Sequence, residues 1–218
     1  MNTKEIYIVG AGSVGGHVAL NIEEYTKNYT IAGFFDDDSA KIGTRQFGFE
    51  VIGKVDEVLN LHNADVVIGI AFPNIKRKIL GRLSANHSLQ FPSLIHERAW
   101  ISQGVSIGKG CIIYPGTTIN FGSEIEDFVV LNANCSLGHH TRVGAYSSFA
   151  PDVSTGGHTT FGEGVDAGIG ASTIQNMVIG AGSVVGGQSM IINNVSPGAI
   201  VAGVPARTLN EDEMSPTS

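Results

Sequence analysis

Hydrophobic positions in the second half of the chain recur every six residues. A large apolar residue occupies nearly every sixth position from residue 101 to residue 191 without an insertion, with Thr155, Ala167 and Thr173 as exceptions. The six-residue positions are Ile101, Ile107, Ile113, Ile119, Ile125, Leu131, Leu137, Val143, Phe149, Thr155, Phe161, Ala167, Thr173, Ile179, Val185 and Ile191. The positions four residues further on are mostly small or β-branched. This pattern predicts a hexapeptide-repeat parallel β-helix.

The repeat also predicts which residues stack on one another. Three hexapeptides form one triangular coil, so residues 18 apart lie above each other at the strand spacing of about 4.8 Å. About five coils follow, with outer faces that are free to associate. Cys111 and Cys135 are 24 residues apart, so they fall on different sides of the triangle. Both are predicted to be small interior side chains rather than reactive thiols.

The N-terminal segment has a different, non-repeating pattern. A short apolar run, Glu5–Val9, is followed by a glycine turn and then by HVALNIEEY, whose apolar spacing suits a helix. In this strand–turn–helix order, Gly10 makes the tight turn and Gly12 lets backbone approach a phosphate. Gly15 allows close packing of helix on strand. We therefore expect a nucleotide site at the start of this helix.

Two further strands are predicted before residue 95. Thr30–Phe35 ends in three aspartates, at the point where an acid of a dinucleotide enzyme grips the ribose. Ala64–Ala71 is followed by a basic amphipathic helix, NIKRKILGRL. About three βα units fit here, which is half of a dinucleotide fold. A mononucleotide or a nucleotide-sugar is therefore a more plausible ligand than NAD.

These patterns give a fold class of an α/β Rossmann-like domain plus an all-β parallel β-helix. We expect domains at residues 1–95 and 96–209, then a polar tail at 210–218. The net charge of −7, without a basic stripe, argues against a nucleic-acid partner. No apolar stretch is long enough to span a membrane, and the N-terminus lacks the features of a secretory signal. Two cysteines make no disulfide framework. We therefore expect a cytoplasmic protein without a membrane partner.

Histidines provide the candidate chemistry of the repeat region. His139 and His140 are adjacent, and His158 lies 18 residues after His140, so His140 and His158 should stack on one edge of adjacent coils. An imidazole at such a corner exchanges protons near neutral pH and can act as a general base. Surface histidines without a role are one alternative. A three-histidine zinc site is another, disfavoured because adjacent side chains should diverge along an extended chain.

The order of these features resembles the NeuD/PglD-like sugar O/N-acetyltransferases from about Ile6 to Leu209. The matching features are the glycine-turn domain, the Asp-Asp pair, the FPSLIHERAW junction, the hexapeptides, Asn132 before His139, and a final GVPAR. The resemblance implies a left-handed β-helix and a Rossmann-like domain that holds a nucleotide-sugar. It also implies a homotrimer that binds acetyl-CoA between adjacent β-helices.

Residue roles follow from the same resemblance. His139 matches the catalytic base, and His140 stands where the family often has the acid that orients it. Ser148, Ile169 and Gly187 match acetyl-CoA contacts, although the family has His in place of Ser148. Phe72 stands where several relatives have Asn. The positions that match nucleotide-sugar contacts are Gly10, Gly12, Ser13, Val14, Gly15, Asp36 and Asp37.

The predicted function is transfer of acetyl from acetyl-CoA to the amino group of a UDP-, dTDP- or GDP-linked amino-deoxysugar, for glycan or surface-polysaccharide synthesis. Acetyl-CoA is the donor and no metal is expected. The oxyanion donor is expected at a glycine-rich corner such as Gly156-Gly157. The alternatives are O-acetylation of a sugar such as sialic acid, and a non-catalytic nucleotide-binding scaffold.

Overall fold

The structure is a computed structural model, which describes residues 3–210. The chain divides between Glu97 and Arg98 into two compact units. The predicted tail lies, from residue 211 on, outside the described residues. Within the described part, no helix is long and apolar enough to cross a membrane.

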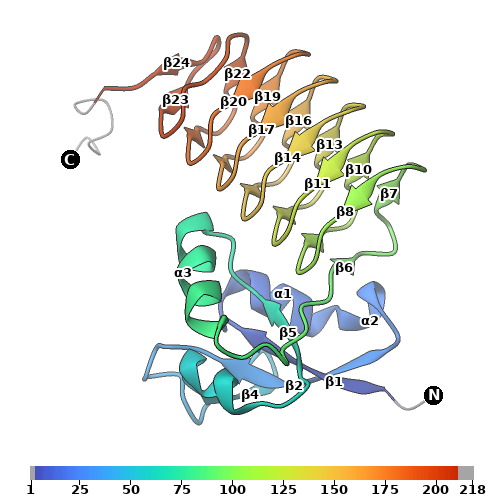
Figure 1. The fold of residues 1–218 in the computed structure, drawn as a ribbon, viewed down its shortest axis with the longest axis vertical. Helices are drawn as coiled ribbons and strands as arrows, with labels where there is room; N and C mark the ends of the chain where they lie inside the picture. The colour runs from blue at the N-terminus through green and yellow to red at the C-terminus, as the bar shows by residue number, and fades with distance from the viewer. Residues whose placement is uncertain (1–2, 211–218) are drawn as a thin grey trace. The chain divides into compact units, whose positions relative to one another are not determined.

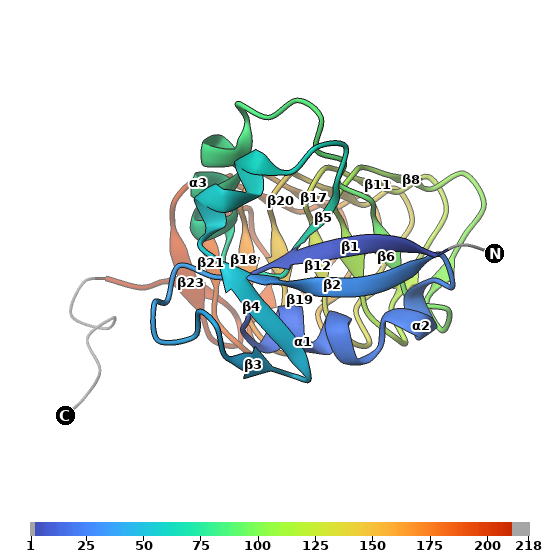
Figure 2. The same ribbon diagram turned by 90° about the horizontal axis from the view of Figure 1, so that it is seen from below.

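The first unit contains a five-stranded sheet with the strand order β3-β4-β2-β1-β5. Its strands are β1 (Lys4–Val9), β2 (Tyr29–Phe35), β3 (Arg45–Gln46), β4 (Phe49–Gly53) and β5 (Asp65–Ile68). Strand β1 runs parallel to both β2 and β5, and β2 runs parallel to β4 (Figure 2). The buried apolar side chains of this unit come from the parallel strands, such as Ile8 and Val67, and from the helices, such as Val18 and Ile79. This is the Rossmann-like arrangement that the strand–turn–helix pattern predicts.

The helices of this unit differ from the predicted ones at their boundaries. They are α1 (Ser13–Leu20), α2 (Ile22–Tyr25), the 3₁₀ helix η1 (Val55–Asn60) and α3 (Pro73–Leu83), and a short strand β6 (Leu94–Ile95) ends the unit. The single helix expected over residues 17–25 begins earlier and breaks at Asn21. The Asn21 side-chain amide donates to the His17 carbonyl at 2.8 Å, which competes with the helical hydrogen bonds.

The hairpin of β3 and β4 was not predicted from the sequence. These two strands pair antiparallel, and the turn between them places both Phe47 and Gly48 at positive φ, 51° and 87°. A two-residue turn of this kind usually has Asn-Gly or Asp-Gly, and a bulky Phe at positive φ is uncommon. The three predicted strands therefore fall short of the five in the sheet of this unit.

The second unit is a parallel β-helix of two-residue strands, which Figure 1 shows as a succession of coils from green to red. Its repeating strands are β7 (Trp100–Ile101), β8 (Ser106–Ile107), β9 (Ile112–Ile113), β10 (Thr118–Ile119), β11 (Glu124–Ile125), β12 (Val130–Leu131), β13 (Ser136–Leu137), β14 (Arg142–Val143), β15 (Ser148–Phe149), β16 (Ser154–Thr155), β17 (Thr160–Phe161), β18 (Asp166–Ala167), β19 (Ser172–Thr173), β20 (Val178–Ile179), β21 (Val184–Val185) and β22 (Met190–Ile191). Each one ends at a predicted six-residue position. Strands β23 (Ile200–Ala202) and β24 (Arg207–Thr208) follow.

The strands stack with the predicted offset of 18 residues. Thr118 pairs with Ser136 and Ile119 with Leu137, in parallel register, and the same step repeats along all three faces. The residue that ends each strand points inward, so the apolar positions form the core. Cys111 and Cys135 are buried and form no disulfide, as predicted for small interior side chains. Burial raises the pKa of the Cys135 thiol to about 12. The predicted fold class is confirmed.

Candidate functional site

One corner of the β-helix, between the face of β13 and the face of β14, carries the predicted histidines. Residues 18 apart stack there in two neighbouring columns. One column holds Phe121, His139 and Gly157, and the next holds Gly122, His140 and His158. The backbone ties the coils together at this corner, since the His140 N–H donates to the Phe121 carbonyl at 2.9 Å and the His158 N–H donates to the His139 carbonyl at 2.8 Å.

The three imidazoles are in contact with one another. The rings of His140 and His158 stack at 4.7 Å between centroids with planes 6° apart, which confirms the predicted stacking. His139 meets both edge-on, and its Nδ1 lies 3.1 Å from Nδ1 of His140. The Phe121 ring stacks on His139 at 5.4 Å. The corner is therefore a cluster of rings rather than a set of separate surface side chains.

The expectation that His139 and His140 diverge is wrong. It assumed an extended chain, but His140 adopts a left-handed conformation with φ 57°. A left-handed residue at the corner turns its side chain back toward the preceding one, so the two nitrogens meet. His158 has the same φ, one coil further on.

Two glycines leave the room that the imidazoles occupy. A Cβ at Gly157 would lie 2.7 Å from Nε2 of His139, and a Cβ at Gly122 would lie 2.7 Å from Cδ2 of His140. Any larger residue at Gly157 or Gly122 would collide with an imidazole ring. Gly157 has an ordinary backbone conformation, so the ring alone requires glycine there.

A closed set of hydrogen bonds fixes the residue before His139. The Gly138 N–H donates to Oγ1 of Thr155 at 3.1 Å, and the Thr141 hydroxyl donates to the Gly138 carbonyl at 2.7 Å. Oγ1 of Thr155 lies 3.1 Å from Oγ1 of Thr141 and completes the ring. Thr155 interrupts the apolar repeat, and its hydroxyl holds the Gly138 backbone. Because Gly138 precedes His139, Thr155 helps to position His139.

Neither of the nearest upstream acids is engaged with His139. Glu126 accepts a hydrogen bond from the Ala145 N–H at 2.9 Å, and Asp127 accepts one from the Lys109 N–H at 3.0 Å. His140 occupies the place beside His139 at which the family resemblance implies an acid.

The expected oxyanion donor at Gly156 is already engaged. The Gly156 N–H donates to the Thr173 carbonyl at 3.0 Å and lies 3.2 Å from Oγ1 of Thr173. A bound N–H of this kind is not available to a reacting carbonyl, so Gly156 does not fit that role.

The predicted acetyl-CoA contacts lie on other parts of the β-helix. Ile169 and Gly187 stack on the corner between the faces of β18 and β19, where the Gln188 N–H donates to the Ile169 carbonyl at 2.7 Å. The Ile169 side chain is 57% exposed. Ser148 is buried on β15. Within one chain, these residues are on a different edge of the triangle from His139.

A separate cavity of about 220 Å³ lies in the first unit, where β1, β2 and β5 end. It is lined by Gly10, Gly12, Ser13, Val14, Asp36, Lys41, Gly69, Ile70, Ala71, Phe72 and Ile75. Helices α1 and α3 both begin here, with Gly12 and Phe72 as their N-caps, and neither has an acid in its first turn. Uncapped helix N-termini favour anions, so the cavity suits a phosphate.

The glycine turn is built as the sequence predicts. Gly10 has φ 99°, and a Cβ at Gly12 would meet nothing within 4 Å, which leaves that backbone open to a ligand. Gly15 does not line the cavity. A Cβ there would run into the Gly10 carbonyl, so its role is close helix–strand packing.

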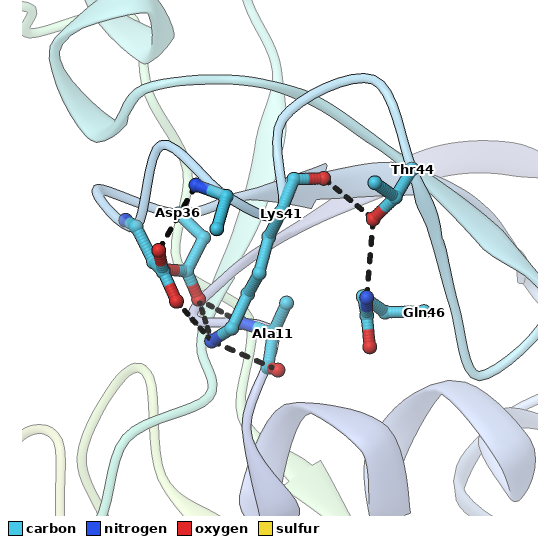
Figure 3. A network of polar contacts seen from close by, with 7 residues as sticks. Ala11, Asp36, Lys41, Thr44 and Gln46 are labelled. Atoms are coloured by element: carbon cyan, nitrogen blue, oxygen red, sulfur yellow. Dashed lines mark hydrogen bonds and ion pairs between the residues drawn. The ribbon is translucent and has the colours of Figure 1, made fainter.

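Asp36 is held by its surroundings, as Figure 3 shows. One carboxylate oxygen accepts from the Ala11 N–H at 2.8 Å and from Nζ of Lys41 at 3.1 Å, and the other accepts from the Asp38 N–H at 2.9 Å. Burial raises the pKa of Asp36, but these donors outweigh it and hold the pKa below its ordinary value. Sequence reasoning missed Lys41, although it is the basic residue that follows the three aspartates.

Asp37 is engaged away from the cavity. It accepts from Arg82 of α3 at 2.6 Å and from the Val55 N–H at 3.2 Å, and Arg82 also binds Asp56 at 2.8 Å. The Arg82 guanidinium lowers the pKa of Asp37. The pair connects β2 to α3 and η1, and the structure does not bring Asp37 together with the other predicted nucleotide contacts.

Fold and site together define a class: a Rossmann-like domain joined to a hexapeptide-repeat β-helix. Residues 5–83, which lie within the first unit, match the family described as PglD N-terminal domain. The resemblance to the NeuD/PglD-like proteins that the sequence indicated is confirmed.

Two solved structures are similar over almost the entire chain. The acetyltransferase domain of PglB from Neisseria gonorrhoeae FA1090, also solved with acetyl coenzyme A, is 27% identical with a TM-score of 0.84; the match covers 94% of this chain and 99% of that one. PerB from Caulobacter crescentus, solved with CoA and GDP-perosamine, is 25% identical with a TM-score of 0.83; the match covers 95% of this chain and 98% of that one.

The curated relatives are similar to this chain over only part of their own length. A serine acetyltransferase of Buchnera aphidicola subsp. Acyrthosiphon pisum is 29% identical over 136 residues, which are 62% of this chain and 45% of that protein. The chain therefore spans less than half the length of this relative.

Proposed function

We propose that this protein transfers the acetyl group of acetyl-CoA to the amino group of a nucleotide-linked amino-deoxysugar. One observation carries the proposal: the His139 imidazole lies at a corner of the β-helix with His140 against its Nδ1, and its Nε2 packs against a glycine, Gly157, rather than a side chain. The similarity to PerB, solved with CoA and GDP-perosamine, and to the PglB acetyltransferase domain supports the two substrates.

His139 acts as the general base. When Nδ1 of His139 donates to Nδ1 of His140, the lone pair on Nε2 is free to accept a proton. The sugar amine attacks the thioester carbonyl carbon, the C–S bond breaks, and the amine proton passes through Nε2 of His139 to the leaving sulfur. His140 is a positioning residue that fixes the tautomer, at the position where the family resemblance implies an acid.

The first unit holds the nucleotide part of the acceptor. Two helix N-termini and the Lys41 ammonium converge on its cavity, which suits the phosphates of a UDP-, dTDP- or GDP-linked sugar. At about 220 Å³, the cavity is below the roughly 300–1,000 Å³ of a pocket for a drug-sized ligand. It therefore holds the diphosphate region and leaves the sugar outside.

The acetyl donor lies between two copies of the chain in a homotrimer. Within one chain, Ile169 and Gly187 occupy a different edge from His139, so one copy alone does not bring the predicted donor contacts to the base. A neighbouring β-helix that presents its Ile169 edge to the His139 edge completes the site. Ser148 is already buried within one chain, so its side chain is not part of the surface that such a neighbour covers.

The test is thiol release from acetyl-CoA across UDP-, dTDP- and GDP-linked amino-deoxysugars. We expect turnover with one of them and a loss of about 10²–10⁴-fold in the His139→Ala variant, the range that a general base contributes. His87→Ala changes an exposed histidine of the first unit and is the matched control.

The other outcomes separate the alternatives. Turnover only with hydroxyl sugars would establish O-acetylation instead. Failure to bind acetyl-CoA at all would reject the enzyme and favour a nucleotide-binding scaffold. Full activity in His139→Ala would reject His139 as the base.

A further inference from the structure

The three imidazoles at the His139 corner have more nitrogen ligands than a general base requires. His139, His140 and His158 each offer one nitrogen, and these three atoms all lie within 4.8 Å of one another. A general base and its orienting partner account for two rings. The proposed reaction gives no role to His158, although its ring touches both of the others.

The spacing fits a tetrahedral metal ion. Zn–N bonds of about 2.0–2.1 Å at tetrahedral angles separate two ligand nitrogens by roughly 3.3 Å. His139 and His140 already hold their Nδ1 atoms 3.1 Å apart. His140 and His158 are exposed, so their rings can turn to close the longest separation of 4.8 Å by less than about 2 Å.

The ligand set selects the kind of ion. Three imidazoles, with neither Glu126 nor Asp127 directed at them, suit zinc, copper or nickel rather than magnesium or calcium. The Phe121 ring packs against both His139 and His140 and reduces the access of water to one side of the cluster. Three protein ligands leave a fourth position open to water.

We propose that His139, His140 and His158 of one chain bind a single divalent transition-metal ion, best represented by Zn²⁺, and that the bound ion blocks acetyl transfer. The metal takes the lone pairs of neutral imidazoles and replaces the His139–His140 hydrogen bond. The inhibitory part rests on the proposed function, because it assumes that His139 is the base. The ion is an inhibitor here and supplies no chemistry to the reaction.

The binding test uses Co²⁺ as a visible probe on the metal-free, full-length protein, followed by competition with Zn²⁺. We expect one Co²⁺ per chain with the absorption of a tetrahedral ion, displaced by Zn²⁺. His158→Gln should weaken binding by at least the roughly 10–100-fold that loss of an outer partner costs, since it removes a direct ligand. His87→Gln is the control for adventitious binding and should bind as the wild type does.

Two results would overturn the site: no stoichiometric Co²⁺ binding, or equal binding by His158→Gln and the wild type.

Inhibition of acetyl transfer is measured in a separate experiment. Zn²⁺ should inhibit thiol release in the wild type, EDTA should restore it, and His158→Gln should need at least tenfold more Zn²⁺ for the same inhibition. If the metal binds but metal-free protein never transfers acetyl, the proposed function fails and the site stands. If transfer proceeds and Zn²⁺ bound to the three histidines leaves it unchanged, the inhibition is wrong.

Discussion

In the N-terminal unit, the Asp36 carboxylate is bound by two backbone amides and an ammonium group, whereas in the β-helix the His139 imidazole is surrounded by other rings. Asp36 and Asp37 together accept bonds from Ala11, Asp38, Lys41, Val55 and Arg82. His139 contacts Phe121, His140 and His158. Each carboxylate is therefore held by several donors of its own chain, while the imidazoles can exchange partners.

This difference separates two kinds of residue. A carboxylate that already accepts several hydrogen bonds from its own chain has less capacity left for a substrate, so it acts mainly by shaping the chain around the cavity. An imidazole beside a second imidazole can give up its partner to take a proton or a metal. We expect changes in the first unit to affect binding and stability, and changes at the corner to affect the chemical step.

Gly157→Ala should have the largest effect on the chemistry among changes that leave His139 in place. The added Cβ would lie 2.7 Å from Nε2 of His139 and displace the ring. A displacement of about 1 Å costs on the order of 10²-fold in rate, so we expect that loss in kcat with little change in melting temperature.

Gly156→Ala is the matched comparison in the same corner. Its Cβ would run into the backbone N of Gln175, which cannot move aside, so this variant should lose thermal stability first. Kinetics and thermal melts of both variants check the prediction. A Gly157→Ala protein with wild-type kcat would contradict the placement of the base.

Lys41→Met should weaken acceptor binding. A charge-assisted hydrogen bond contributes about 1.5–3 kcal/mol, which corresponds to a roughly 10- to 100-fold higher KM for the nucleotide-sugar. The KM for acetyl-CoA should not change. Lys109→Met removes an exposed lysine from the β-helix and serves as the control. An unchanged KM for the nucleotide-sugar in Lys41→Met would remove Lys41 from the phosphate site.

Acid should destabilise the protein through the carboxylates of Asp36 and Asp37. The pKa values of Asp36 and Asp37 lie below the ordinary 3.8 in the folded state, so the unfolded chain binds protons more readily. Their stabilisation is complete above pH 3.8 and is lost as the pH falls through the lowered values. Thermal melts from neutral pH downward should show this loss, and Asp37→Asn should make it shallower. An identical acid dependence in Asp37→Asn would contradict the ion pair with Arg82.

Thr155→Val should have the smallest effect. It removes one acceptor for the Gly138 N–H and one link to Thr141, at a cost of about 1 kcal/mol. We expect a slightly lower free energy of unfolding and a few-fold lower kcat, because Gly138 precedes His139. Thr160→Val, on the outer side of β17, should change stability by less than about 0.5 kcal/mol. Equal behaviour of the two variants in denaturant titrations would argue against the positioning role of Thr155.

The β-helix could be predicted from the sequence almost strand by strand because every coil packs its apolar residues in the same way. An apolar residue at each sixth position, such as Ile119 or Leu137, both ends a strand and fills the core. The stacking of His140 on His158 followed from the same 18-residue step. The first unit has no repeat. Its hairpin was not predicted because the turn has Phe47 at positive φ, where sequence rules expect Asn, Asp or Gly.

The details of both sites depended on contacts that no local pattern records. The sequence places His139 next to His140, but only the left-handed turn at His140 brings their nitrogens together. Asp37 matches the family position, yet Arg82, 45 residues away, binds it. Lys41 lines the cavity because a loop folds back over the glycine turn. The outcomes at Asp37 and Lys41 follow from tertiary structure, whereas the left-handed turn at His140 recurs every six residues along the repeat, as at His158.

The most direct test of the central claim is the mass of the product formed from acetyl-CoA and a nucleotide-linked amino-deoxysugar. The account predicts that one sugar of the UDP-, dTDP- and GDP-linked panel gains a single acetyl group. Its hydroxyl analogue should gain none, and the gain should disappear in His139→Ala and persist in His87→Ala. Acetylation by His139→Ala at the wild-type rate, or no acetylated sugar from a protein that binds both substrates, would contradict it.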